Sequence, residues 1–187
     1  MTFPPGNLIS ALIYSKTVFS HFIFRQDINN SESIDLLKSC GVNFEQHAKQ
    51  GIDPVRFGEL FTMSGLVLNS SITWITFQGL IDIAFLLRIL TGCDLPEMPA
   101  DFNAILHIFF PQLYDVKVLV EKVPIYAGSL LKIARDLKLK EEKDRFQSAE
   151  ESRLTVCVFF KIRGLVYKNV IDDKFNGKLF YLQNVYF

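Results

Sequence analysis

The sequence predicts a single α/β domain in which helices cover a sheet. Short runs rich in β-branched and aromatic residues alternate with segments of helical periodicity, and no internal repeat or Gly/Ser-rich linker divides residues 1–187. A chain of 187 residues is long enough for one core. A domain of that size buries roughly 70% of the surface that its unfolded chain exposes.

The first elements expected along the chain are a short helix and a buried strand. Asp53 is a helix-capping residue type, Pro54 suits the first helical position, and Gly65 suits the end of the helix. Residues 72–77, ITWITF, are all β-branched or aromatic and are too few for a typical helix. They therefore predict a strand.

Two helices and a second strand are expected next. Apolar residues at helical spacing predict a helix over 81–90, which ends before a glycine, and another over 100–110, which Pro111 ends. The run 113–120, LYDVKVLV, is short and largely apolar, with Asp115 near its start. It predicts the second strand.

The last part of the chain is predicted to be helical on both sides of a loop. Residues 129–139 have apolar positions at helical spacing, whereas 140–145, KEEKDR, are a charged and solvated loop. Ser148 and Glu151 then fit the N-cap and N3 positions of a capping box, which predicts a helix that runs through Leu165.

Charge and cysteine content limit the classes of function. Lys plus Arg and Asp plus Glu both number 20, so the formal net charge is zero and no global basic field attracts phosphate. We expect no DNA partner on this ground. The three cysteines fit neither a disulfide framework nor a zinc site, which favours the cytoplasm or nucleus. Polar residues interrupt both long apolar stretches, 8–24 and 65–90, so we expect no membrane partner.

Longer motifs cover most of the chain. They are DINNSESIDLLKSCGVNFEQHAKQGIDPVRFGELFTMSGLVL at 27–68, WITFQGLIDIAFLLRILTG at 74–92, FPQLYDVK at 110–117 and SRLTVCVFFKIR at 152–163. Over about residues 19–182 the chain resembles the CAF-type (CCR-associated factor/POP) catalytic subunits of the CCR–NOT deadenylase complex.

This resemblance implies a fold, an activity and partners. The fold is an RNase H-like mixed sheet covered by helices, in one domain over 1–187. The activity is that of a poly(A)-specific 3′-to-5′ exoribonuclease in mRNA poly(A) shortening, in which four acidic residues hold two divalent ions, Mg²⁺ or Mn²⁺. The implied partners are the NOT scaffold subunit, a partner deadenylase and poly(A) RNA, in the nucleus and cytoplasm.

The chain departs from the family pattern at the acidic positions. An Asp-x-Glu pair on the family's first strand has no counterpart, because residues 1–16 contain no acid, and we expect the first strand or strands to be missing. Asp82 matches the third acid, with Gln78 where the family has histidine. Glu151 replaces the fourth aspartate, and Phe146 stands in place of the assisting histidine. Asp82 and Glu151 are therefore the candidate metal ligands, and weak metal binding is expected.

Each candidate ligand also has a structural interpretation. Asp82 near a helix start favours the helix N-terminal amides, and Glu151 fits the N3 position of a capping box. Three functional hypotheses follow. The chain is a poly(A) ribonuclease, a catalytically inactive interaction module for the NOT scaffold or partner nuclease, or part of a protein whose upstream exon supplies the Asp-x-Glu strand.

Overall fold

The computed structural model describes residues 35, 38–39, 43–140 and 147–182 of the 187-residue chain. Its longer elements in chain order are helices α2 (Phe44–Gln50), α3 (Pro54–Met63), strand β1 (Trp74–Thr76), helices α4 (Leu80–Thr91), α5 (Pro99–Phe109), strand β2 (Leu113–Asp115), and helices α6 (Val116–Val120), α7 (Leu130–Asp136) and α8 (Gln147–Leu165). Two 3-10 turns lie at Pro124–Tyr126 and Asp173–Phe175. Among the described residues, no helix is long and apolar enough to span a bilayer.

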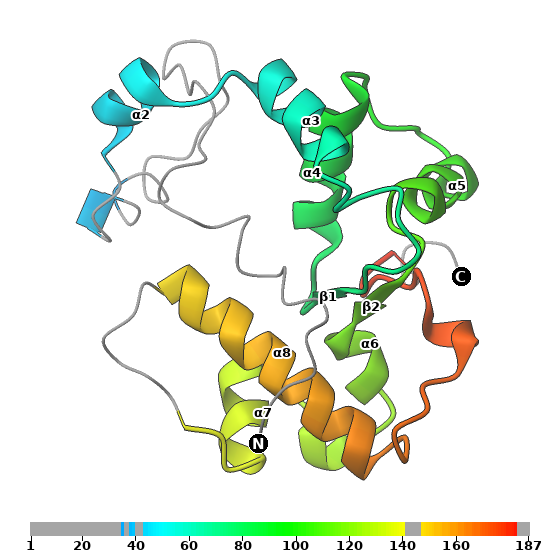
Figure 1. Cartoon of the computed structure of the whole chain (residues 1–187). Coiled ribbons are helices and arrows are strands. Elements are labelled where there is room, and N and C mark those ends of the chain that lie inside the picture. The colour runs from blue at the N-terminus through cyan, green and yellow to red at the C-terminus, as the bar shows by residue number, and fades with distance from the viewer. Residues whose placement is uncertain (1–34, 36–37, 40–42, 141–146, 183–187) are drawn as a thin grey trace.

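A small parallel sheet lies at the centre of the described fold. β1 pairs with β2 in the register Trp74 to Leu113 and Thr76 to Asp115. Figure 1 shows α3, α4 and α5 on one side of this sheet and α6, α7 and α8 on the other. The predicted α/β class, with helices covering a sheet, is therefore confirmed.

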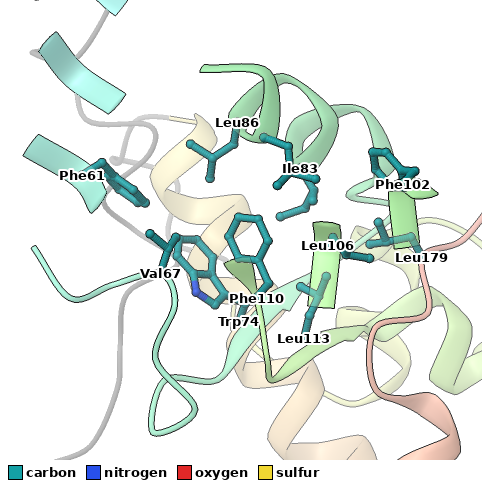
Figure 2. Close-up of a cluster of buried hydrophobic side chains, with 11 residues drawn as sticks. Phe61, Val67, Trp74, Ile83, Leu86, Phe102, Leu106, Phe110, Leu113 and Leu179 are labelled. Atoms are coloured by element: carbon teal, nitrogen blue, oxygen red, sulfur yellow. The ribbon is translucent and has the colours of Figure 1, made fainter. Parts of the chain in front are cut away.

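Side chains that alternate between the two faces of the sheet divide the core into two hydrophobic clusters. Trp74 and Leu113 face the cluster formed with α3, α4 and α5, whereas Ile75 and Tyr114 pack against the cluster formed with α6, α7 and α8. Successive side chains of a strand point to opposite faces, so two short strands serve both clusters. In Figure 2 the Trp74 and Phe110 rings lie at the centre of the first cluster, and they meet edge to face at 5.0 Å between ring centroids.

The predicted helices are confirmed where the sequence carries cap signals. The Asp53 carboxylate accepts hydrogen bonds from the amides of Val55 and Arg56 at the start of α3. Gly92 follows α4 in the left-handed conformation with φ 63°, which glycine adopts without steric cost. Pro99 occupies the first turn of α5.

The prediction of one strand over 113–120 is wrong beyond Asp115. The chain leaves β2 there and forms helix α6, in which Val116, Val118, Leu119 and Val120 are buried. The Asp115 side chain caps this helix by accepting from the amide of Lys117 at 3.0 Å. Burial of these four residues leaves the run apolar and without helical periodicity, so local composition did not distinguish helix from strand.

The start of the last helix also differs from the sequence prediction. α8 begins at Gln147, so Ser148 lies inside the first turn instead of at the N-cap. The helix ends at Leu165, as predicted. Most of the predicted charged loop, 141–145, and the apolar stretch 8–24 lie outside the described residues.

Candidate active site

A cavity of about 360 Å³ lies between β1, the start of α7, and helices α4 and α8. Binding sites in open α/β sheets lie beyond the carboxyl ends of strands, and this cavity follows β1 past its end at Thr76 as far as Gln78. Its lining residues are Trp74, Ile75, Thr76, Phe77, Gln78, Asp82, Ile83, Leu86, Ser129, Leu130, Leu131, Glu151, Ser152 and Thr155.

The two predicted acids lie on this one cavity. Asp82 is an exposed residue of the first turn of α4, and Glu151 is an exposed residue of the first two turns of α8. Both residues line the cavity, although they are far apart in sequence. The structure therefore brings together the pair that the sequence singled out, and their role as metal ligands stays a prediction.

Gln78, two residues beyond the end of β1, has a strained backbone. Its φ of 55° lies in the left-handed region, which non-glycine residues rarely adopt. The backbone amide donates to Asp115 Oδ1 at 2.9 Å, and the side-chain Nε2 donates to Tyr181 Oη at 3.2 Å. These contacts hold Gln78 at the rim of the cavity and compensate for the strain.

Asp115 is the residue that organises this end of the sheet, and sequence reasoning did not assign it this role. Its carboxylate accepts from four backbone amides, those of Gln78, Gly79, Lys117 and Phe180. Only 1% of its surface is exposed. Burial raises the pKa of Asp115 above its usual value, and the four amide hydrogen bonds partly oppose that rise.

Hydroxyl groups form the remaining polar surface of the cavity. Thr155 Oγ1 donates to the Glu151 carbonyl at 2.8 Å, and the Ser129 hydroxyl caps α7 by accepting from the Lys132 amide. The Oγ1 of Thr76 is buried and has no hydrogen-bond partner within the described part of the chain. Hydroxyl side chains at these positions gave no recognisable pattern in the sequence.

The side chains at the cavity do not fit a two-metal centre. Mg²⁺ and Mn²⁺ prefer several oxygen ligands with enough negative charge to neutralise them. Asp82 and Glu151 supply two carboxylates. Within residues 43–140 and 147–182, no three His, Cys, Asp or Glu side chains lie close enough together to hold a metal ion.

Residues 60–163 match the sequence profile described as CAF1 family ribonuclease, which is more than half of the chain. The chain belongs to this family. It is 37% identical over 162 residues to the "Probable CCR4-associated factor 1 homolog 10" of Arabidopsis thaliana. It is also 37% identical over 159 residues to the "Poly(A) ribonuclease pop2" of Schizosaccharomyces pombe. The family resemblance seen in the sequence is confirmed.

These alignments cover more of this chain than of its relatives. They include 87% of this chain and 58% of the Arabidopsis protein, and 85% of this chain and 48% of the Schizosaccharomyces protein. The chain therefore spans about half the length of these relatives.

Solved structures agree on the CAF1/Pop2 nuclease fold. The S. pombe Pop2p structure in its Mg²⁺ and Mn²⁺ bound form superposes with a TM-score of 0.78 at 36% identity, covering 87% of this chain and 65% of that one. A chain from the structure of the yeast NOT1 MIF4G domain co-crystallised with CAF1 also matches, with a TM-score of 0.70 at 29% identity and the same two coverages, 87% and 65%. The RNase H-like fold predicted from the resemblance is thus confirmed.

Proposed function

We propose that this CAF1-family chain is an interaction module for the NOT scaffold and that it has little or no poly(A) ribonuclease activity. The observation that carries the proposal is the acid content of the cavity, where Asp82 and Glu151 are the two carboxylates of the described lining. The residue at the family's first histidine position is Gln78, whose amide group cannot serve as a general base near neutral pH.

Weak divalent metal binding is part of this proposal. Two carboxylates balance the charge of one divalent ion and leave half the charge of a pair of ions uncompensated, and Mg²⁺ gives up its water ligands reluctantly. Titration calorimetry of the chain with Mg²⁺ or Mn²⁺ tests the point. Two tight sites in the titration would contradict the proposal.

An exposed apolar groove between α3 and α4 supports the scaffold-binding role. It is lined by Val55, Thr62, Met63, Ile89 and Leu90, among other residues. Two apolar residues of this lining are largely exposed, Met63 at 81% and Val55 at 67%, and exposed apolar surface of this kind often marks an interaction site. The relative that was co-crystallised with a NOT1 MIF4G domain supplies the class of partner, a helical scaffold domain of the NOT type.

A second candidate function is catalysis, as a poly(A)-specific 3′-to-5′ exoribonuclease that works beside a partner deadenylase on poly(A) RNA. The observation that favours it is the convergence of Asp82 and Glu151 on one cavity. The name of the S. pombe relative, poly(A) ribonuclease, gives the substrate class. Either function would be exercised in the nucleus and cytoplasm, where mRNA is processed and degraded.

One preparation of the whole chain distinguishes the two candidates. Binding to a purified NOT-type MIF4G domain is measured by calorimetry, and shortening of a labelled A-tailed RNA is measured with Mg²⁺ or Mn²⁺ present. We expect binding without shortening. Shortening of the RNA at rates well above background would support the enzyme, and absence of both results would contradict both functions.

A further inference from the structure

Two residues with strained backbones meet near the end of the sheet. Tyr181 has a φ of 73° and Gln78 a φ of 55°, and both values lie in the left-handed region that non-glycine residues rarely adopt. The Gln78 Nε2 group donates to the Tyr181 hydroxyl at 3.2 Å. Asp115 accepts from the amides of Gln78 and Phe180, which places the C-terminal segment beside the end of β2 (Figure 1). Strained residues that the surrounding structure holds in place are concentrated at functional sites.

A lysine ammonium lies close to two aromatic rings beside this strained pair. Lys117 Nζ is 5.8 Å from the centre of the Phe77 ring and 5.5 Å from the centre of the Phe180 ring. It also donates to the Gly128 carbonyl at 2.6 Å, which uses one of its three N–H donors. Phe77 lines the cavity, and so does Ser129, the residue after Gly128. The ammonium therefore lies next to the cavity lining.

Tyr181 adds an exposed aromatic ring on the other side of Phe180. The ring centroids of Tyr181 and Phe180 are 4.5 Å apart, and Tyr181 is 53% exposed. Because Tyr181 and the Lys117 ammonium both lie against the Phe180 ring, a ligand of the size of a nucleotide is large enough to reach both. An exposed ring with a cation beside it offers a stacking surface and a counter-charge.

We propose that Tyr181 and Lys117 form a binding site for single-stranded RNA that does not select a particular base. A base stacks on the Tyr181 ring, and a neighbouring phosphate contacts the Lys117 ammonium. Every base has a ring face, so stacking on an aromatic side chain tolerates any sequence. This binding goes beyond the proposed function, since it requires neither the scaffold nor Asp82 and Glu151.

Single-stranded RNA fits this surface better than an acidic protein segment or a duplex does. A carboxylate would pair with the Lys117 ammonium and leave the Tyr181 ring unused, whereas a nucleotide supplies an anion and a planar ring together. A duplex keeps its bases stacked inside, where an aromatic side chain does not reach them. The chain has a formal net charge of zero, so we expect modest affinity that depends strongly on salt.

RNA binding by the full chain is measured by fluorescence anisotropy, with EDTA present to prevent metal-dependent cleavage. The probes are a labelled oligoadenylate and a labelled mixed-sequence RNA of about twelve nucleotides each, and we expect their affinities to differ by less than about fivefold.

Tyr181→Gly is the main variant, because glycine adopts the φ of 73° without steric cost while the ring is lost. We expect this variant to bind both RNAs at least about fivefold more weakly than the wild type. Tyr181→Phe restores the ring without the hydroxyl that contacts Gln78, and it should recover the binding. Tyr181→Asn also tolerates this backbone conformation and repeats the comparison if the glycine variant unfolds at a lower temperature.

The salt dependence of binding tests the phosphate contact. Lys117→Gln removes the charge and keeps an N–H donor for the Gly128 carbonyl. Each phosphate contact of a single strand contributes about −0.7 to the slope of log K against log salt, so this variant should reduce the slope by about 0.7. Lys174→Gln is the matched control and should leave the slope unchanged. Lys174 lies 5.3 Å from the centre of the Phe175 ring and pairs with Asp172, and neither it nor Phe175 lines the cavity.

Three results would overturn the proposal. The first is that neither RNA binds at low salt, and the second is that only the oligoadenylate binds, which would indicate recognition of the base edge. The third is that Tyr181→Gly binds RNA as tightly as the wild type while an oligoglutamate of equal length displaces the RNA. That result would identify the surface as a site for acidic protein segments.

Discussion

The backbone amide of Gln78 donates a 2.9 Å hydrogen bond to the carboxylate of Asp115, which lies 37 residues further along the chain. The same carboxylate binds the amide of Phe180, 65 residues beyond it. One buried side chain at the end of β2 therefore joins the turn after β1 to the C-terminal segment. The position of Gln78 at the cavity depends on this arrangement.

Replacing Asp115 with asparagine is expected to destabilise the fold strongly. Four amides donate to the two carboxylate oxygens, and an asparagine Nδ2 group would face two of these donors with another donor. We expect a loss of roughly 2–4 kcal/mol in the free energy of unfolding, measured by urea denaturation. Asp94→Asn is the control, because that exposed side chain forms a surface ion pair with Arg88 and should change stability by less than about 0.5 kcal/mol.

The contribution of Asp115 to stability should depend on pH with a defined sign. Burial raises its pKa in the folded chain above the usual value of 3.8, so the folded state holds this proton to higher pH than the unfolded state does. Its contribution is then fully present below pH 3.8 and is lost as the pH rises through the raised pKa. The stability difference between the wild type and Asp115→Asn should therefore decrease from about pH 4 upward. A difference that grows with pH would show that the four amides outweigh burial.

Two glycines should respond to alanine in opposite directions. A Cβ at the buried Gly79 would lie 2.7 Å from Thr76 Cγ2, whereas one at the exposed Gly164 of α8 would meet only Asn169 Oδ1 at 3.7 Å. We expect Gly79→Ala to destabilise the chain by roughly 1–3 kcal/mol through overpacking. Gly164→Ala should stabilise it by about 0.5–1 kcal/mol through helix propensity. Thermal unfolding of both variants measures the two changes in stability. Equal shifts of the unfolding temperature with the same sign would contradict the close contact of Gly79 with Thr76.

The exposed groove between α3 and α4 gives a prediction about scaffold binding. Met63→Glu places a charge on an 81% exposed side chain, so the stability of the fold should change by less than about 0.5 kcal/mol. Binding to a NOT-type MIF4G domain should weaken at least about tenfold, because an apolar contact is replaced by a desolvated charge. Val170→Glu is the matched control, since Val170 is 77% exposed and lies outside the groove. Equal loss of binding in both variants would mean that the groove is not the contact surface.

Sequence patterns predicted the helices well because their signals are local. Asp53, Pro54 and Gly92 mark helix ends through their own side chains or backbone geometry, and all three occupy those positions in the fold. The run after Asp115 was misassigned because every residue of α6 except Lys117 is buried, which removes the periodicity that distinguishes helix from strand.

The candidate site was predictable only in part for a related physical reason. The family motifs identified Asp82 and Glu151 as candidate metal ligands, and in the fold both residues line one cavity. The role of Asp115 depends on amides distant in sequence, which no local pattern reveals. The one available signal was an aspartate inside an apolar run, because a buried carboxylate must find hydrogen-bond donors.

The final prediction concerns repair of the altered site. Changing Glu151→Asp and Phe146→His together restores the family residues at the last acidic motif, although Phe146 lies outside the described residues. A positioned general base contributes typically about 10²- to 10⁴-fold to a rate, so a repaired histidine could help only if the rest of the site were present. Gln78 and the two-carboxylate lining are unchanged by the repair. We therefore expect no recovery of poly(A) shortening.

Shortening of a labelled A-tailed RNA is measured with Mg²⁺ or Mn²⁺ for the wild type, the double variant and Asp82→Ala. Asp82 is one of the two acids on the cavity, so its alanine variant defines the background from contaminating nucleases. The rates of RNA shortening by all three chains should agree within error. Two acids are too few to hold the pair of ions that would neutralise the charge developing on the phosphate. Activity in the wild type that Asp82→Ala abolishes would identify a working ribonuclease. Activity that appears only in the double variant would show that loss of the last motif, and not the small number of acids, is what limits this chain.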